Sequence, residues 1–198
     1  KPGLKRYDRS RVRPKDANWI RVLMSDQASH LQSLLQRGVQ AHGAGNLAEA
    51  ERLYREALEA SPGQPTALYL LGVLALQVGR ADVAAELIAQ TVRSQPGNAE
   101  AHYNLGNAYQ ALGRTADAVG CFQETLRLEP SYASAHYNLG TLQKAEGALE
   151  AAEQSFRAAV QHAPNLGQAW CNLGLVLFER GRDEAAVAAY RTGLKAVP

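Results

Sequence analysis

The sequence predicts an all-α fold, a solenoid of five helix–turn–helix units, and three observations lead to this prediction. Five prolines follow one another at intervals of 34 residues, and glycines recur at the same interval. Alanine is abundant, whereas isoleucine and phenylalanine are sparse, a composition that favours close-packed helices over sheets. Each interval contains two helical stretches separated by a glycine. A fixed period of this length is the signature of a repeat architecture.

Four sets of residues keep the period without a gap, which fixes the register of the units. The sets are Pro62, Pro96, Pro130, Pro164 and Pro198; Gly38, Gly72, Gly106, Gly140 and Gly174; Gly45, Gly79, Gly113, Gly147 and Gly181; and Ala50, Ala84, Ala118, Ala152 and Ala186. With Leu31 as the first position, the predicted units are 31–64, 65–98, 99–132, 133–166 and 167–198.

The segment before the first unit differs in charge from the rest of the chain. Residues 1–23 hold eight basic and two acidic residues, a net charge of +6, whereas residues 24–198 carry −4. Pro2, Gly3 and Pro14 lead us to expect an irregular segment over 1–23. Met24 has the character of a natural start, which would make residues 1–23 non-native; alternatively, they form a basic arm for an acidic partner or nucleic acid. Residues 24–30 lead into the first helix.

Within each unit, the spacing predicts one helix over positions 1–14 and a second over positions 17–31. Glycine at position 8 lets the two backbones approach closely, because a Cβ there would push them apart. A bulky residue at position 24, such as Phe122, fills the space opposite. Glycine at position 15 ends the first helix as a left-handed C-cap, and an acidic residue begins the second, where the helix dipole favours it. Proline at position 32 stops the second helix.

These positions resemble the pattern of the tetratricopeptide repeat. The third unit offers Leu105, Gly106, Tyr109, Ala118, Phe122, Thr125 and Pro130, and the fifth offers Trp170, Leu173, Gly174, Ala186, Tyr190, Gly193 and Pro198. Arg37 departs from the pattern, because it replaces the expected leucine in the first unit. The resemblance implies a right-handed α-solenoid whose concave face is lined by the first helix of each unit.

Asparagines and tyrosines recur on the side that this resemblance makes concave. The expected peptide-binding residues are Asn104, Asn138, Asn172, Tyr69, Tyr103, Tyr137, Asn107, Gln110, Thr141 and Lys144. An amide offers both a donor and an acceptor, so a ladder of amides can pair with a peptide backbone whatever its side chains. Alternatively, the asparagines bond inside the array and orient adjacent helices, and the tyrosines pack between those helices.

Two subfamilies offer more specific comparisons. Chaperone-binding members hold a carboxylate with two asparagines and several basic residues; Asn107 and Asn138 match, but Tyr103, Gln168 and Asn172 stand where the basic residues are needed. The stretch Ala-His-Tyr-Asn-Leu-Gly, at 101–106 and 135–140, instead resembles repeats of O-linked N-acetylglucosamine transferase and its SPINDLY-like relatives. In those proteins an asparagine ladder engages substrate polypeptide, and a glycosyltransferase domain follows.

No sequence pattern points to catalysis, a metal or a cofactor. His102 and His136 stand at a packing position, and no Ser/His/Asp arrangement, Cys/His arrangement or phosphate-binding glycine loop is visible. Cys121 and Cys171 lie far apart and lack ligand spacing, which favours a reducing cytoplasm.

The leading functional hypothesis is therefore a scaffold that binds a protein or peptide. The alternatives are a substrate-recruiting arm of a bacterial glycosyltransferase, and a module that self-assembles through its last repeat, where Tyr190 and Leu194 are expected to be exposed. A membrane span is not expected, nor is nucleic-acid binding outside residues 1–23.

Overall fold

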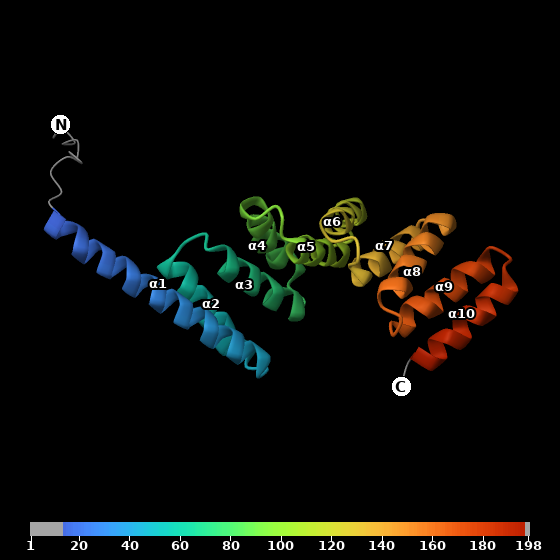
Figure 1. The fold of residues 1–198 in the computed structure, drawn as a ribbon, viewed down its shortest axis with the longest axis horizontal. Coiled ribbons are helices and arrows are strands. Elements are labelled where there is room, and N and C mark those ends of the chain that lie inside the picture. The colour runs from blue at the N-terminus through green and yellow to red at the C-terminus, as the bar shows by residue number, and fades with distance from the viewer. Residues whose placement is uncertain (1–13, 197–198) are drawn as a thin grey trace, which may run out of the picture. The chain divides into compact units, whose positions relative to one another are not determined.

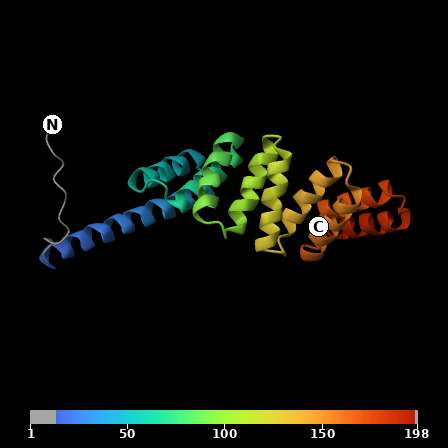
Figure 2. The same cartoon turned by 90° about the horizontal axis from the view of Figure 1, so that it is seen from above.

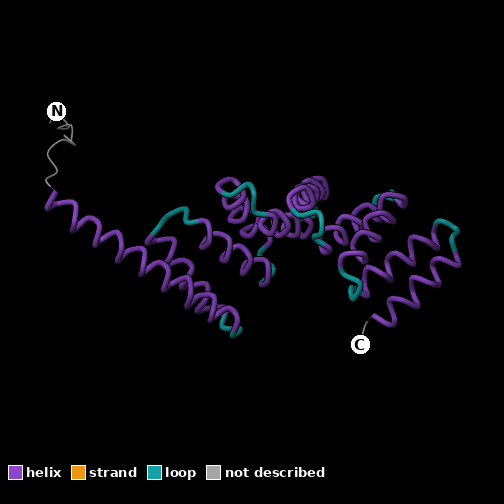
Figure 3. Tube along the Cα trace, in the orientation of Figure 1, coloured by secondary structure: helices purple, strands orange, loops and turns teal. Residues whose placement is uncertain are grey.

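The computed structural model describes residues 14–196, and over these residues every regular element is an α-helix (Figures 1 and 3). The helices are α1 (Pro14–Gly43), α2 (Leu47–Ala60), α3 (Pro65–Gln77), α4 (Ala81–Ser94), α5 (Ala99–Ala111), α6 (Thr115–Leu128), α7 (Ala133–Ala145), α8 (Leu149–His162), α9 (Gly167–Glu179) and α10 (Asp183–Ala196). The predicted all-α helical-repeat fold is confirmed, with two helices in each repeat.

Helix α1 corrects one expectation about the N-terminal segment. We expected residues 1–23 to be irregular, but the helix begins at Pro14 and continues into the first repeat. Proline is compatible with the first turn of a helix, where its missing N–H has no intrahelical acceptor. Neither glycine nor proline follows until Gly38, so nothing in the sequence interrupts the helix between them. Residues 1–13 lie outside the described part of the chain.

The turns between the paired helices have the predicted left-handed glycines. Gly45, Gly79, Gly113, Gly147 and Gly181 all have positive φ, between +70° and +77°. A side chain at these positions would be strained, because L-residues rarely adopt this region. An acidic residue lies in the first turn of each helix that follows, as expected from the helix dipole.

The two helices of each repeat come close together at the glycine of position 8. A Cβ added to Gly106 would lie 2.6 Å from Cε1 of Phe122, and one added to Gly38 would lie 2.5 Å from Cε1 of Tyr54. Both rings are fully buried. The bulky residue of the second helix therefore occupies the space that the glycine leaves, as the sequence predicted.

The chain divides into two units, which we describe separately. The first ends at Ala67, in the first turn of α3, and the second runs from Leu68. In the first unit, Leu34 of α1, Leu53 and Ala57 of α2, and Ala67 at the start of α3 form a buried core.

In the second unit, α4 packs on α5, α6 on α7 and α8 on α9, so that these helices lie side by side (Figure 2). Its buried clusters are built largely from alanine, leucine and the position-24 aromatics. No helix in the described part of the chain combines the length and the apolar character needed to span a membrane.

Candidate binding face

The first helices of neighbouring repeats are joined by hydrogen bonds between tyrosine and asparagine side chains. Asn104 on α5 donates from Nδ2 to the hydroxyl oxygen of Tyr69 on α3, at 2.7 Å. Asn138 on α7 makes the same bond to Tyr103 at 3.4 Å, and Asn172 on α9 makes it to Tyr137 at 3.3 Å. Each pair is 35 residues apart, so one Tyr–Asn pair repeats with the period of the array. We call these three pairs the rungs.

A further amide bond reinforces the middle rung. Nδ2 of Asn138 also donates to Oδ1 of Asn107, at 2.8 Å. The two asparagines that match the carboxylate-holding pattern are thus bonded to each other. Tyr103 and Asn172, which stand where basic residues would be needed, belong to rungs.

Each rung uses one side of an asparagine amide and leaves the other side without a bond in the described part of the chain. The Nδ2 donors are used inside the array, as the structural interpretation expects. However, the structure gives Oδ1 of Asn104, Asn138 and Asn172 no partner among the described residues, and all three side chains are half-buried rather than sealed. The rungs therefore form one continuous series from α3 to α9, with one acceptor at each step.

Tyr69 of the first rung, and Tyr132 beside the second, both have raised pKa values. Burial, together with a hydrogen bond to the Glu100 carboxylate, raises the pKa of Tyr69 above its ordinary value. Burial, together with the nearby Glu100, Tyr103 and Glu129, raises the pKa of Tyr132 to about 12. The ring of Tyr132 lies 4.8 Å from that of Tyr103, centroid to centroid. These hydroxyls remain protonated near neutral pH and can act as donors.

The remaining predicted site residues are half-buried on the same helices. Thr141 donates from Oγ1 to the backbone oxygen of Tyr137, one turn earlier in α7. Gln110 on α5 and Lys144 on α7 have no side-chain hydrogen bond among the described residues. The Gln110 amide and the Lys144 ammonium group could therefore bond to a ligand without first breaking a hydrogen bond within the described part of the chain.

Position 4 shows how a polar ring fits between repeats. Nε2 of His102 lies 3.0 Å from the carbonyl oxygen of Pro96, and Nε2 of His136 lies 2.9 Å from that of Pro130. Trp170 makes the equivalent bond from Nε1 to the carbonyl of Pro164, at 2.9 Å. Because the indole nitrogen can only donate, the shared geometry indicates that the histidines also donate. These histidines tie each first helix to the preceding turn.

One buried carboxylate was not predicted from the sequence. Glu153 on α8 is 1% exposed and bonds to Arg157, Arg180 and Arg182. We had assigned Glu153 no role from the sequence, where the only acidic residues with an assigned role begin each second helix. Burial raises the pKa of Glu153, but the guanidinium groups of Arg157 and Arg180 lower it more, so the net shift is downward. The available signal was its position, because the second, third and fifth repeats place Ala85, Val119 and Val187 there.

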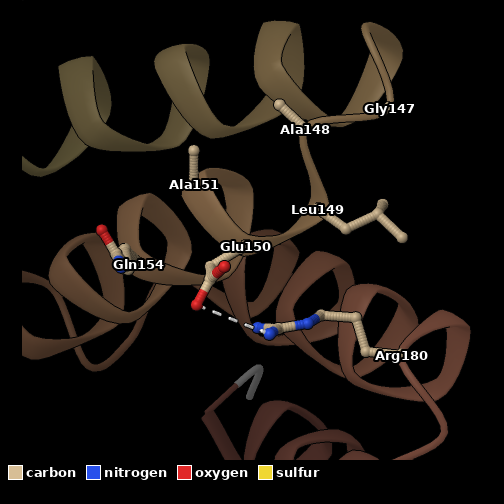
Figure 4. A pocket seen from close by; sticks show the side chains of 7 residues that line it. All are labelled: Gly147, Ala148, Leu149, Glu150, Ala151, Gln154 and Arg180. Carbon is tan, nitrogen blue, oxygen red and sulfur yellow. Dashed lines mark ion pairs between the residues drawn. The ribbon is translucent and has the colours of Figure 1, made fainter.

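An open pocket lies beside this cluster, at the turn between α7 and α8 (Figure 4). Glu150 and Arg180 form an ion pair across it, with 3.7 Å between Oε1 and Nη2. The other lining residues are Gly147, Ala148, Leu149, Ala151 and Gln154. The pocket offers few groups that could recognise a ligand. Among the described residues, no three His, Cys, Asp or Glu side chains gather where they could hold a metal ion.

Comparison with protein families decides the classification. A family model described as tetratricopeptide repeat matches residues 35–99, 74–119 and 103–167, and a second model with the same description matches residues 167–197. The chain belongs to the tetratricopeptide repeat family. The family name thus rests on matches that together span most of the chain. No curated protein matches the sequence.

Solved structures of other tetratricopeptide repeat proteins share the fold. MamA is 26% identical, with a TM-score of 0.74, over 80% of this chain and 93% of MamA. TTC0263 from Thermus thermophilus is 27% identical, with a TM-score of 0.65, over 85% of this chain and 92% of that protein. YrrB is 21% identical, with a TM-score of 0.69, over 82% of this chain and 84% of YrrB.

Proposed function

We propose that this tetratricopeptide repeat chain is a protein–protein interaction scaffold that binds an extended peptide segment along α3, α5, α7 and α9. The observation that carries the proposal is the series of rungs at Tyr69–Asn104, Tyr103–Asn138 and Tyr137–Asn172. Each rung fixes its asparagine from one side through Nδ2. The amide oxygen Oδ1 is then held in place but accepts no hydrogen bond from the described residues, and because the side chain is already ordered, the entropic cost of binding a ligand is lower.

The chemistry of a rung is complementary to a peptide unit. The asparagine Oδ1 can accept a bond from a backbone N–H of the ligand. The hydroxyls of Tyr103 and Tyr137 receive a bond from asparagine, so their own O–H groups remain able to donate to a backbone carbonyl. Tyr69 differs, because its hydroxyl also bonds to Glu100. The second and third rungs therefore offer a donor and an acceptor each, and the first offers an acceptor.

The size of these interactions limits what the rungs can do alone. A hydrogen bond contributes about 0.5–1.5 kcal/mol net, whereas micromolar affinity needs about 8 kcal/mol. The five bonds that the rungs can offer, three from amide oxygens and two from tyrosine hydroxyls, supply part of that free energy. The aromatic faces of the tyrosines, together with Gln110 and Lys144, must contribute the rest. This dependence on backbone contacts predicts moderate affinity and tolerance of varied ligand side chains.

A precedent within the same fold supports the proposal. YrrB is described as a TPR protein with an unusual peptide-binding site. That relative shares the helical-repeat architecture with this chain, and the precedent concerns the fold rather than individual residues. The residue-level proposal rests on the rungs.

The test begins with a peptide selected from a random dodecapeptide display library, whose affinity for the full chain is then measured by fluorescence anisotropy. Gln110→Ala combined with Lys144→Ala should weaken binding without changing the melting temperature, since neither side chain has a described hydrogen bond. Asn104→Ala combined with Asn138→Ala should lower both affinity and melting temperature, because Nδ2 bonds are lost.

The matched control is Asn98→Ala. The side chain of Asn98 accepts a bond from the backbone N–H of Ala101 and caps α5, so its loss should cost about 1 kcal/mol of stability. It takes no part in a rung, and affinity should be unchanged. If the cap variant weakened binding as much as the Asn104/Asn138 variant, stability rather than contact would explain both, and the proposal would be wrong.

The alternative, a substrate-recruiting arm of a glycosyltransferase, rests on the Ala-His-Tyr-Asn-Leu-Gly stretches. In that case too the rungs would bind an extended polypeptide. The genomic reading frame that carries this chain distinguishes the two. A nucleotide-sugar transferase domain in that frame would favour the recruiting arm, and its absence would favour the free-standing scaffold.

A further inference from the structure

Helix α10 carries an uncovered apolar pair. Leu194 is 78% exposed and Val187 is 47% exposed, although both are large hydrophobic side chains. They are seven residues apart, two turns of helix, and so lie on one side of α10. We call Val187 and Leu194 the end pair. Tyr190, which we also expected to be exposed, instead packs against Gly174 within its own repeat.

The earlier repeats show what normally happens to such residues. The residue equivalent to Leu194 in the fourth repeat is Val160, which is 6% exposed and lies in a buried cluster with Ala169 of the next repeat. The residue equivalent to Val187 is Glu153, which is buried under Arg180 and Arg182 of the next repeat. The end pair therefore occupies positions that the array covers with a neighbouring helical hairpin.

We propose that a second copy of this chain covers the end pair, with the two α10 helices packed antiparallel about a twofold axis. A twofold interface uses the same surface on both copies, so each end pair meets the other copy's α10. The proposal concerns a surface separate from the rungs and does not depend on peptide binding.

Stacking of the first repeat of one copy on the last repeat of another is disfavoured by the sequence of α1. Repeats two to five place alanine at position 3 and leucine at position 7, and these residues are buried. The first repeat has Ser33 and Arg37 at those positions, and both are exposed. Covering the end pair with this surface would bury a guanidinium group on an apolar patch, which is costly without a partner. An open chain of copies is therefore not expected.

The charges of α10 favour antiparallel pairing with itself. Asp183 and Glu184 lie in the first turn, whereas Arg191 and Lys195 lie in the C-terminal half, and all four are exposed. In an antiparallel pair, the acidic end of each helix lies beside the basic end of the other. Parallel pairing would place like charges together, which is unfavourable. The antiparallel arrangement also opposes the two helix dipoles.

Sedimentation equilibrium of the full chain, from micromolar to near-millimolar concentration, tests the proposal. The chain should shift from 21.4 kDa to twice that mass and no further. Val187→Lys combined with Leu194→Lys should abolish the dimer. Val83→Lys is the matched control, because Val83 is 37% exposed on α4 and lies outside the end pair. Circular dichroism should show unchanged helicity in both variants.

Charge reversal tests the orientation. Asp183→Lys with Glu184→Lys, and separately Arg191→Glu with Lys195→Glu, should each weaken the dimer about tenfold or more, and an equal mixture of the two variants should restore it. A parallel pair would not be weakened by either reversal. A wild-type chain that stays at 21.4 kDa at every concentration, or a mixture that fails to dimerise, would overturn the proposal.

Discussion

Replacing Gly106 with alanine tests how closely the two helices of a repeat approach each other. The added Cβ would lie 2.6, 2.9 and 3.1 Å from three carbons of the Phe122 ring, whereas ordinary contacts begin at 3.4 Å. Phe122 is fully buried and cannot turn away into solvent. Overpacking of this kind costs about 1–3 kcal/mol, and the better helix propensity of alanine returns about 1 kcal/mol. We expect Gly106→Ala to be destabilised by roughly 0–2 kcal/mol.

Gly120 provides the matched control within the same repeat. It lies inside α6, and a Cβ added there would have no neighbour within 4 Å. Gly120→Ala should therefore stabilise the chain by about 1 kcal/mol. Urea unfolding followed by circular dichroism should separate the two variants by about 1–3 kcal/mol. Equal stabilisation by both substitutions would refute the reasoning, and Phe122→Leu should partly rescue Gly106→Ala by making room.

Three further predictions follow from the buried bonds. Glu153→Gln should lower the free energy of unfolding by about 3 kcal/mol in thermal unfolding, because it removes the charged partner that three arginines share. Glu150→Gln, which removes an exposed ion pair, should lower it by less than about 0.5 kcal/mol. Because the pKa of Glu153 is lowered in the folded chain, its contribution to stability is full above its unfolded pKa, near 4.3, and is lost as pH falls through the folded pKa. Stability of the wild type measured against falling pH should show this loss, and the Glu153→Gln variant should not. His102→Trp should keep a bond to the carbonyl oxygen of Pro96, equivalent to the bond that Trp170 makes to Pro164. His102→Phe should lower the free energy of unfolding by about 1 kcal/mol in the same assay.

The periodic features of the fold could be predicted because each depends on one residue type at one position. Glycine at position 15, illustrated by Gly113 with φ of +70°, marks the turn without knowledge of anything distant. Glycine at position 8 and the aromatic at position 24 predict each other's contact. The start of α1 at Pro14 was missed because proline was interpreted as a sign of irregular chain, although it is also compatible with a first helical turn.

The bonds between repeats were harder to predict. The sequence places Asn138 and Tyr103 in the correct register, but whether the amide faces a neighbour or a ligand depends on side-chain directions across 35 residues. The cluster at Glu153 breaks the period, because no other repeat combines a glutamate at this position with all three equivalent arginines. Comparison with the other repeats marks Glu153 as unusual, but only the packed structure shows which arginines contact it.

Side-chain amide spectra of the ¹⁵N-labelled chain, recorded while the selected dodecapeptide is added, test the central claim most directly. The account predicts that the Nδ2 resonances of Asn104, Asn138 and Asn172 shift and saturate together, because the ligand binds to Oδ1 of the same amides. Resonances of Asn46 and Asn98, which cap α2 and α5, should stay in place. Saturating shifts confined to α4, α6 and α8, with the three rung amides unmoved, would contradict the account.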